Sequence, residues 1–179
     1  VDISRHPSSD QREIDQIIPL VEAIKQRFDT AISIDTSRYA VMSAAINVGA
    51  DMINDQRALQ SEGALDLIKT KSTPVCLMDF PIGRSPGQEC LETFIQSVKD
   101  RLLCFAERCL AAGMQRDNII LDPGFGQGHY GKNLDENYYL LAHLNQIVDL
   151  GFPVLSGWSR KSMIGDVIGG VPATQRLPG

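Results

Sequence analysis

The stretch Asn118-Ile-Ile-Leu-Asp-Pro-Gly-Phe-Gly126 passes from an apolar, strand-like run into a polar, glycine-rich turn. A second stretch, Pro153-Val-Leu-Ser-Gly-Trp-Ser-Arg-Lys-Ser162, makes the same change. Asp122 therefore follows one predicted strand, and a Ser-Arg-Lys-Ser cluster follows another. In α/β proteins the functional groups gather at the carboxyl ends of parallel strands. The two stretches predict a parallel α/β fold with a site at one end of its sheet.

Strand-like and helix-like segments alternate along the chain. The strand-like runs occupy residues 31–34, 52–54, 74–78, 118–121 and 153–155, and residues 1–3 have the character of the tail of an earlier strand. Nearly all-apolar strands that alternate with helices indicate a parallel sheet covered by helices. About six strand–helix units are present, whereas a closed (β/α)₈ TIM barrel needs about 250 residues. We therefore expect an α/β fold, a (β/α)₈ TIM barrel of which residues 1–179 form a part, as one domain.

Three helices have specific boundaries. Pro19 is expected to kink or restart the first, and Gly113 is expected to end the longest. A third is predicted to run without interruption through Tyr138 and Val148 to Gly151. The longest helix has apolar residues at spacings of three and four, namely Leu91, Phe94, Ile95, Val98, Leu102, Phe105 and Cys109.

Composition excludes several classes of protein. The 179 residues are 43% hydrophobic and 22% charged with a net charge of −5, which argues against broad attraction to nucleic acid or anionic lipid. No apolar run approaches the length of a membrane span, and no signal-peptide pattern opens the chain, so we expect a cytoplasmic protein. The cysteines form no Cys-x-x-Cys pair and are expected to be reduced and buried. We expect no metal site built from cysteine or histidine.

Polar side chains follow the predicted strands. They are Asp2, Asp35, Asn54, Asp122 and the Ser156-Gly157 pair, with Met78 at the same level. Each has a structural alternative, because Asp35 or Ser37 could cap a helix and Asn54-Asp55 or Asp122-Pro-Gly could form a turn. Several such groups together with Lys161 favour a binding site.

The residue types indicate a ligand. Carboxylate and amide oxygens accept hydrogen bonds, which suits the adjacent N–H donors of an amino-pyrimidinone edge. Lys161 could donate to a carbonyl or ring nitrogen. Ser159, Arg160 and Ser162 begin a predicted helix whose free N–H groups favour an anion. The alternatives are a surface ion pair for Arg160 and helix capping for the serines.

Four motifs in this order resemble the dihydropteroate synthase family of pterin-binding enzymes. They are Ile34-Asp-Thr-Ser37, Ile53-Asn-Asp55, Leu121-Asp-Pro-Gly-Phe-Gly126 with Gly131-Lys-Asn133, and Ser159-Arg-Lys-Ser-Met-Ile-Gly165. The resemblance implies a (β/α)₈ barrel that joins 6-hydroxymethyl-7,8-dihydropterin pyrophosphate to p-aminobenzoate in folate biosynthesis, releasing pyrophosphate and 7,8-dihydropteroate. It also implies Mg²⁺, a homodimer and membership of a family that sulfonamides target.

The resemblance assigns roles to residues of this chain. Asp35, Asp122 and Lys161 would act in catalysis, the two carboxylates by stabilising a cationic pterin. Ser162 would hold the p-aminobenzoate carboxylate, and Phe125 or Tyr130 would form an aromatic wall. The substrate-binding set as a whole would be Asp2, Asp35, Asn54, Met78, Asp122, Phe125, Gly157, Lys161 and Ser162.

The chain departs from the family pattern in several places. The first strand, with an Asn ligand for Mg²⁺, would lie before Val1, and the last strand, with an Arg-x-His pair, would lie after Gly179. Arg5 is the remnant of a pyrophosphate-side loop, Asp79 replaces a His, and about three extra residues precede Tyr130. We therefore expect residues 1–179 alone to be inactive. A pterin-binding methyltransferase domain and a non-catalytic homologue remain alternatives.

Overall fold

A parallel four-stranded sheet forms the centre of the molecule in a computed structural model that describes residues 9–127 and 130–177. The strands are β1 (Ser33–Asp35), β2 (Met52–Asp55), β3 (Val75–Met78) and β4 (Ile119–Asp122), paired in chain order. An isolated parallel bridge between Leu121 and Val154 extends this order by one segment. Sequential parallel pairing with a helix after each strand is the winding of a barrel, whereas a doubly wound sheet reverses its order. The parallel sheet expected from the sequence is confirmed.

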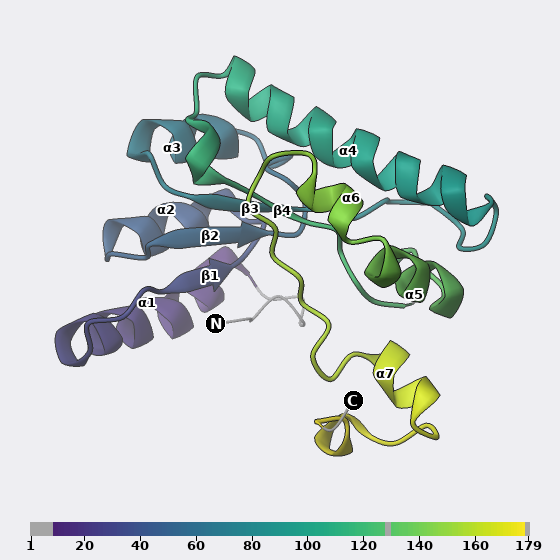
Figure 1. The fold of residues 1–179 in the computed structure, drawn as a ribbon. Helices are drawn as coiled ribbons and strands as arrows, with labels where there is room; N and C mark the ends of the chain where they lie inside the picture. Colours follow the sequence, from purple (N-terminus) through teal and green to yellow (C-terminus); the bar gives the residue numbers. More distant parts are fainter. Residues whose placement is uncertain (1–8, 128–129, 178–179) are drawn as a thin grey trace.

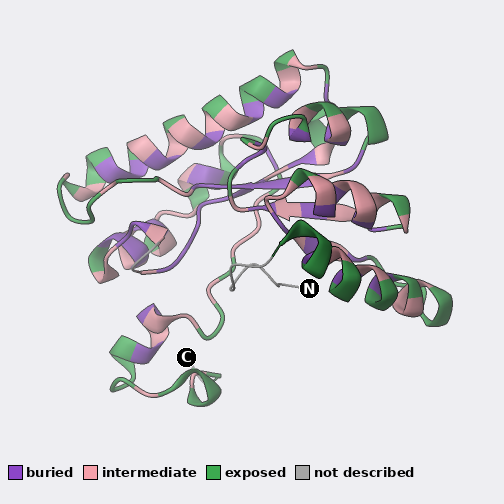
Figure 2. Ribbon diagram, turned by 180° about the vertical axis from the view of Figure 1, so that it is seen from behind, coloured by how far each residue is buried: buried purple, intermediate pink, exposed green. Residues whose placement is uncertain are grey.

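Four helices lie beside the sheet, namely α1 (Asp10–Arg27), α2 (Tyr39–Asn47), α3 (Ala64–Lys71) and α4 (Leu91–Ala111). The first precedes β1, and the other three follow β1, β2 and β3 (Figure 1). The helix-facing residues Ile34, Ile53, Val75 and Ile119 form one row across the sheet, and none of them is exposed. Their neighbours Ser33 and Met52 point to the other face and are only partly buried. The core therefore lies between the sheet and the helices, as the burial colours of Figure 2 show.

The first helix continues through its proline. Ser9 caps α1 by accepting a hydrogen bond from the Arg12 N–H at 3.3 Å, and the helix then runs unbroken past Pro19 to Arg27. Pro19 is exposed, so the backbone carbonyl that loses its partner can be hydrated on the solvent side of the helix. The predicted restart at Pro19 is therefore wrong.

The predicted helix through Tyr138 and Val148 is broken in two. It forms α5 (Leu134–Ala142) and α6 (Asn145–Val148), with His143 as the residue that ends α5. The His143 Nδ1 lies 2.8 Å from the Tyr139 carbonyl oxygen, and the two rings stack with centroids 4.0 Å apart. A side chain that competes for a helix carbonyl favours a helix end at this position.

The predicted strand at residues 153–155 is reduced to the single bridge. The Leu121 N–H donates to Pro153 O, and the Leu155 N–H donates to Leu121 O, both at 2.9 Å. Two short 3₁₀ helices complete the described elements, η1 (Arg116–Asn118) and η3 (Ala173–Gln175). The segment from Ser156 leads to α7 (Ser162–Val167), which lies apart from the sheet (Figure 1). The predicted strand tail at residues 1–3 lies outside the described residues.

The cysteines only partly match the prediction. All four are free thiols, but Cys90 and Cys104 are exposed, while Cys76 and Cys109 are buried. Cys104 lies on the solvent face of the amphipathic helix α4, and Cys90 precedes that helix. The predicted burial is therefore wrong for two of the four. In the described part of the chain no helix is both long enough and apolar enough to span a membrane.

Candidate active site at the carboxyl ends of the strands

Asp35 and Asn54 are neighbours at the carboxyl ends of β1 and β2. They are paired in register, and the Asn54 Nδ2 donates to Asp35 Oδ2 at 3.4 Å. Gln56 Nε2 donates to both oxygens of Asp35, at 3.3 and 3.2 Å. The Asp35 carboxylate is therefore oriented by two amides. Gln56 was not among the predicted site residues, although its position two residues after Asn54 returns it to the same face of the chain.

Asn54 carries an unsatisfied acceptor. Its Oδ1 is buried, and no hydrogen-bond partner lies within the described atoms. Buried polar atoms in native proteins are almost always paired. A carbonyl oxygen of this kind is suited to accept an N–H from a ligand.

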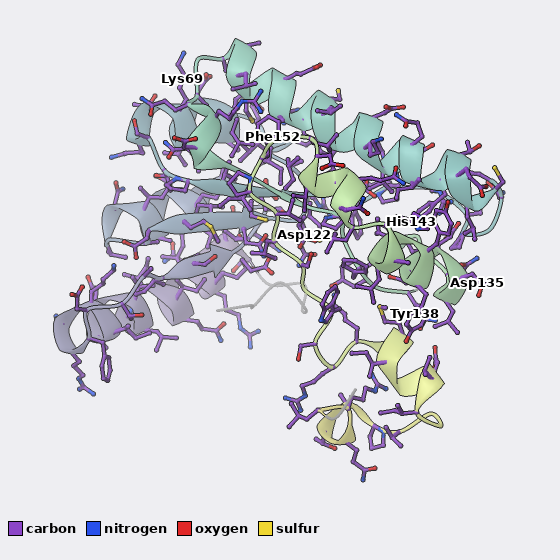
Figure 3. The ribbon with its side chains drawn as sticks, in the orientation of Figure 1. Lys69, Asp122, Asp135, Tyr138, His143 and Phe152 are labelled. Carbon is purple, nitrogen blue, oxygen red and sulfur yellow. The ribbon has the colours of Figure 1, made fainter. Side chains whose placement is uncertain are left out.

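Asp122 and Met78 close the bottom of the site. They pair in register at the ends of β4 and β3, and each is 6% exposed. The Gly124 N–H donates to Asp122 Oδ1 at 2.8 Å, so one carboxylate oxygen stabilises its own turn, as the structural alternative proposed. Burial raises the pKa of Asp122 to about 6, against the opposing effects of that hydrogen bond and of Lys161. Figure 3 shows Asp122 at the end of its strand.

The turn after Asp122 requires glycine at position 124. Gly124 has a φ of +70°, and a Cβ built there would lie 2.2 Å from the backbone oxygen of Asp79. We expect Gly124→Ala to destabilise the fold by about 3 kcal/mol or more, because the clash is with backbone and adds to left-handed strain. Urea denaturation would measure the loss. Gly83→Ala is the matched control, since Gly83 has a φ of +78° with nothing within 4 Å of the added Cβ. Equal losses for the two variants would contradict the clash.

Asp55 has a structural role. Its buried carboxylate accepts hydrogen bonds from the Arg57 and Leu59 N–H groups, at 2.8 and 2.7 Å, and from the Ser37 hydroxyl at 2.5 Å. The turn alternative for Asn54-Asp55 therefore holds for Asp55. Ser37 does not cap α2, because the residue at the cap is Arg38, which makes no side-chain cap bond.

A cavity of about 1130 Å³ opens above these residues. Asp35, Lys161 and Ser162 line it together with Phe80 and Tyr130, and so do four arginines, Arg38, Arg57, Arg160 and Arg176. Three of the predicted substrate-binding residues therefore meet at one cavity. Asn54, Met78, Asp122 and Gly157 are not among its lining residues. Asn54 is paired with Asp35, whereas Met78 and Asp122 are paired with each other further along the same edge of the sheet.

Only one of the two predicted aromatic residues reaches the cavity. Phe125 is 1% exposed and packs edge-on against Trp158, with ring centroids 5.4 Å apart. Phe125 therefore lies in the core and not among the residues that line the cavity, and its predicted place in the aromatic wall stays a prediction. Tyr130 lines the cavity instead, with Lys161 Nζ 3.9 Å from its ring centroid. Phe80, which sequence reasoning missed, stands edge-on to Tyr130 at 6.1 Å.

Lys161 and Ser162 lie at the start of α7. The residue at the helix cap is Lys161, and it makes no side-chain cap bond, so the capping alternative for Ser159 and Ser162 is wrong. The Arg160 Nε donates to the Ala173 carbonyl at 3.0 Å rather than to a surface carboxylate. The Tyr138 hydroxyl, on the side of α5 that faces α7 in Figure 3, donates to the Met163 carbonyl at 3.1 Å.

Asp79, which stands where the family pattern has a His, is paired with two basic side chains. The fully buried Asp79 carboxylate accepts hydrogen bonds from Lys132 Nζ at 3.0 Å and from Arg101 Nε at 2.6 Å. The Lys132 side chain is also fully buried, and burial lowers its pKa despite the nearby carboxylate. The sequence offered only a weak signal for this pair, because the two residues lie far apart in the chain.

Two predicted residues and the predicted metal remain. Asp2 and Arg5 lie outside the described residues. Among residues 9–127 and 130–177 no group of three or more His, Cys, Asp or Glu side chains could hold a metal ion.

Dihydropteroate synthases are similar to this chain in sequence and in fold. The dihydropteroate synthase of Haemophilus influenzae is 42% identical over 175 residues, which cover 96% of this chain and 62% of that protein. A solved dihydropteroate synthase from Coxiella burnetii in complex with pteroic acid is 56% identical, with a TM-score of 0.93 over 96% of this chain and 63% of that one. The dihydropteroate synthase of Xanthomonas albilineans with 4-aminobenzoic acid is 35% identical, with a TM-score of 0.88 over 97% and 63% of the two chains.

The chain therefore spans about three-fifths of the length of the relatives it matches. The superposition supports the expected α/β barrel class over this length. The family model described as "Pterin binding enzyme" matches residues 2–179, nearly the whole sequence. With acceptor groups at successive strand ends and a lysine facing them, this chain belongs to the pterin-binding enzyme family.

Proposed function

We propose that the protein containing this chain is a dihydropteroate synthase. It would join 6-hydroxymethyl-7,8-dihydropterin pyrophosphate to p-aminobenzoate and release pyrophosphate and 7,8-dihydropteroate. The observation that carries the proposal is the unsatisfied Asn54 Oδ1 beside the Asp35 carboxylate, at the edge of a cavity that also holds Lys161. The similarity to dihydropteroate synthases supports the same reaction.

The pterin would bind against the strand ends. Its amino and ring N–H groups would donate to the ionised carboxylates of Asp122 and Asp35 and to the Oδ1 of Asn54, all of which are acceptors. Lys161 would donate to a pterin oxygen or ring nitrogen. Met78, at the end of β3 beside Asp122, would pack against the ring. The nearly complete burial of Asp122 would strengthen the hydrogen bonds that this carboxylate accepts.

The second substrate would bind at the outer part of the cavity. Ser162 and the N–H groups at the start of α7 would hold the carboxylate of p-aminobenzoate, and Tyr130 would lie against its ring. Gly157, in the segment before Trp158, would give the substrates room, because a Cβ there would meet nothing closer than Leu155 at 4.0 Å.

The reaction would need little proton chemistry. The bond between the pterin methylene carbon and the pyrophosphate oxygen breaks, and positive charge develops on the pterin. Asp35 and Asp122 would stabilise that charge electrostatically. The neutral amine of p-aminobenzoate then forms the new carbon–nitrogen bond and afterwards releases a proton to solvent.

Several features of the family remain proposals for this protein. Mg²⁺ would neutralise the pyrophosphate leaving group. Among the described residues no group of three or more His, Cys, Asp or Glu side chains could hold it. Homodimerisation, the remnant role of Arg5, a substrate contact by Asp2 and the division of the barrel between residues 1–179 and further chain are likewise proposed.

The proposal is tested by assaying the full-length protein that carries this sequence for 7,8-dihydropteroate. We expect product with wild type, and a loss of about hundredfold or more in kcat/KM for Lys161→Met, because a charge that faces the reacting pterin is removed. Lys69→Met is the control, since Lys69 is exposed on α3, well away from Asp122 in Figure 3. Tight binding of pteroic acid without any product would instead favour a non-catalytic homologue.

A further inference from the structure

Arg84 joins the loop after β3 to the loop after β4. Its Nη1 donates to the Gly131 carbonyl at 2.7 Å, its Nη2 to Glu136 Oε1 at 2.6 Å and its Nε to Glu89 Oε1 at 2.9 Å. The guanidinium also lies over the Phe94 ring, 4.9 Å from the centroid. Only 10% of the side chain is exposed. A buried arginine with all three nitrogens engaged holds its partners in one geometry.

Glu136 is the main partner of Arg84, and the two side chains together are called the clasp below. It is 1% exposed, and besides Arg84 it accepts hydrogen bonds from the N–H groups of Gly87 and Asn133, each at 2.8 Å. Burial raises the pKa of Glu136, but the bonds from Arg84, Asn133 and Gly87 outweigh it and lower the pKa below its ordinary value. The carboxylate is therefore ionised at neutral pH, and one side chain ties together two loops and the first turn of α5.

The clasp fixes a short segment residue by residue. The Gly131 carbonyl is held by Arg84, the Lys132 amine lies 3.0 Å from Asp79 Oδ2, and the Asn133 N–H is held by Glu136. Three consecutive residues, 131–133, are thus anchored to three different side chains. Tyr130 immediately precedes this segment, so its backbone position follows from the anchored end.

The Tyr130 ring is confined on its other sides. A Cβ at Gly126 would lie 2.5 Å from Tyr130 Cδ2, which means that the ring rests directly on that glycine. Phe80 meets it edge-on, and Lys161 Nζ lies 3.9 Å from its centroid. The ring therefore fits these neighbours in one position only. Displacement of the adjacent Gly131 would move the Tyr130 backbone and take the ring out of that position, away from Lys161.

We propose that Arg84 is a positioning residue, whose clasp with Glu136 holds Tyr130 over Lys161 and so shapes the part of the cavity that receives p-aminobenzoate. The identity of that ligand rests on the proposed function, whereas the placement of Tyr130 does not. Arg84 touches neither substrate in this proposal. It acts through Gly131 and Tyr130.

The first test needs no substrate. We expect protons on the Lys161 side chain, which lies over the Tyr130 ring, to be shifted upfield in the NMR spectrum of the full-length protein. Arg84→Met should abolish that shift, and Arg84→Lys should restore only part of it, because lysine lacks the planar fork. Arg116→Met is the matched control, since Arg116 also bonds a loop carbonyl, Gly151 O at 3.0 Å, and covers a ring, Phe152 at 4.1 Å. An unchanged shift in Arg84→Met would overturn the proposal.

The second test measures kcat and the KM values for the two substrates. Arg84→Met should raise KM for p-aminobenzoate about tenfold, the size expected for a misplaced charged hydrogen-bond network, with kcat and KM for the pterin pyrophosphate within about twofold of wild type. Equal losses for both substrates would overturn a role specific to the aromatic wall. If Arg84→Met does not fold, Glu136→Gln replaces it, with the same direction and a smaller effect expected. If wild type forms no dihydropteroate, the proposed function fails, and the NMR comparison still decides whether Arg84 positions Tyr130.

Discussion

Replacing Asp79 with asparagine is expected to lower the free energy of unfolding by about 3–5 kcal/mol. Asp79 and Lys132 are both fully buried side chains with charged atoms 3.0 Å apart. Removal of the carboxylate leaves a buried ammonium without its partner, which costs more than the pair contributes. Arg101 is less affected, because 29% of its side chain is exposed and it can be hydrated. Urea denaturation at pH 7 would measure the change.

The pH dependence of this variant gives a second measurement. Burial already lowers the pKa of Lys132 in the wild type, and loss of Asp79 should lower it further. The unfolded chain then binds more protons than the folded one, so the free energy of unfolding should rise with pH. Above the lowered folded-state pKa of Lys132 and below the ordinary lysine pKa, the slope for Asp79→Asn should approach about 1.4 kcal/mol per pH unit for one proton. A flat profile would contradict the assignment.

Two further variants separate this pair from ordinary ion pairs. Asp79→Asn combined with Lys132→Met removes both charges, and its stability should return to within about 1 kcal/mol of wild type, because methionine fills a similar space. Asp51→Asn is the matched surface control, since Asp51 pairs with Lys25 at 2.6 Å while both side chains remain partly exposed. Its loss should be at most about 1 kcal/mol. A double variant as unstable as the single one would disprove the pairing argument.

Replacing Asp122 with asparagine is expected to stabilise the fold at neutral pH while weakening ligand binding. Burial raises the folded-state pKa of Asp122 to about 6, above its value in an unfolded chain. A carboxyl with a raised pKa contributes stability below pH 4, and that contribution is lost as pH rises through about 6. Ionised Asp122 therefore costs at most about 3 kcal/mol at pH 7.5. The asparagine stays neutral and can still accept the Gly124 N–H.

The stability difference between wild type and Asp122→Asn should thus grow from pH 4 to pH 7 and then level off. Binding of pteroic acid to the full-length protein should weaken about tenfold to hundredfold, because asparagine replaces one acceptor oxygen with an NH₂ group that cannot accept a ligand N–H. Calorimetry would give the affinity. Asp135→Asn, on the exposed first turn of α5, should change neither property (Figure 3). Unchanged affinity in Asp122→Asn would remove Asp122 from the pterin site.

Much of the site was predictable because its residues follow strands. A strand is recognised from a few consecutive apolar residues, and the residue at its carboxyl end is then known by position alone. Asp35, Asn54 and Asp122 were predicted as site residues in this way, and the parallel register brings Asp35 beside Asn54 and Met78 beside Asp122. Gln56 and Phe80 were missed because their roles depend on contacts made across neighbouring strands.

The local sequence by itself determined the alternation of strands and helices and the end of the sheet where the polar residues gather, because both follow from periodicity within about ten residues. Only the tertiary structure decided that Tyr130 rather than Phe125 reaches the cavity and that Asp79 pairs with Lys132. Tyr130 and Lys161 lie 31 residues apart in the sequence, and Asp79 and Lys132 lie 53 residues apart. The physical reason is that burial and pairing energies depend on what packs from elsewhere in the chain, and a local pattern does not contain that information.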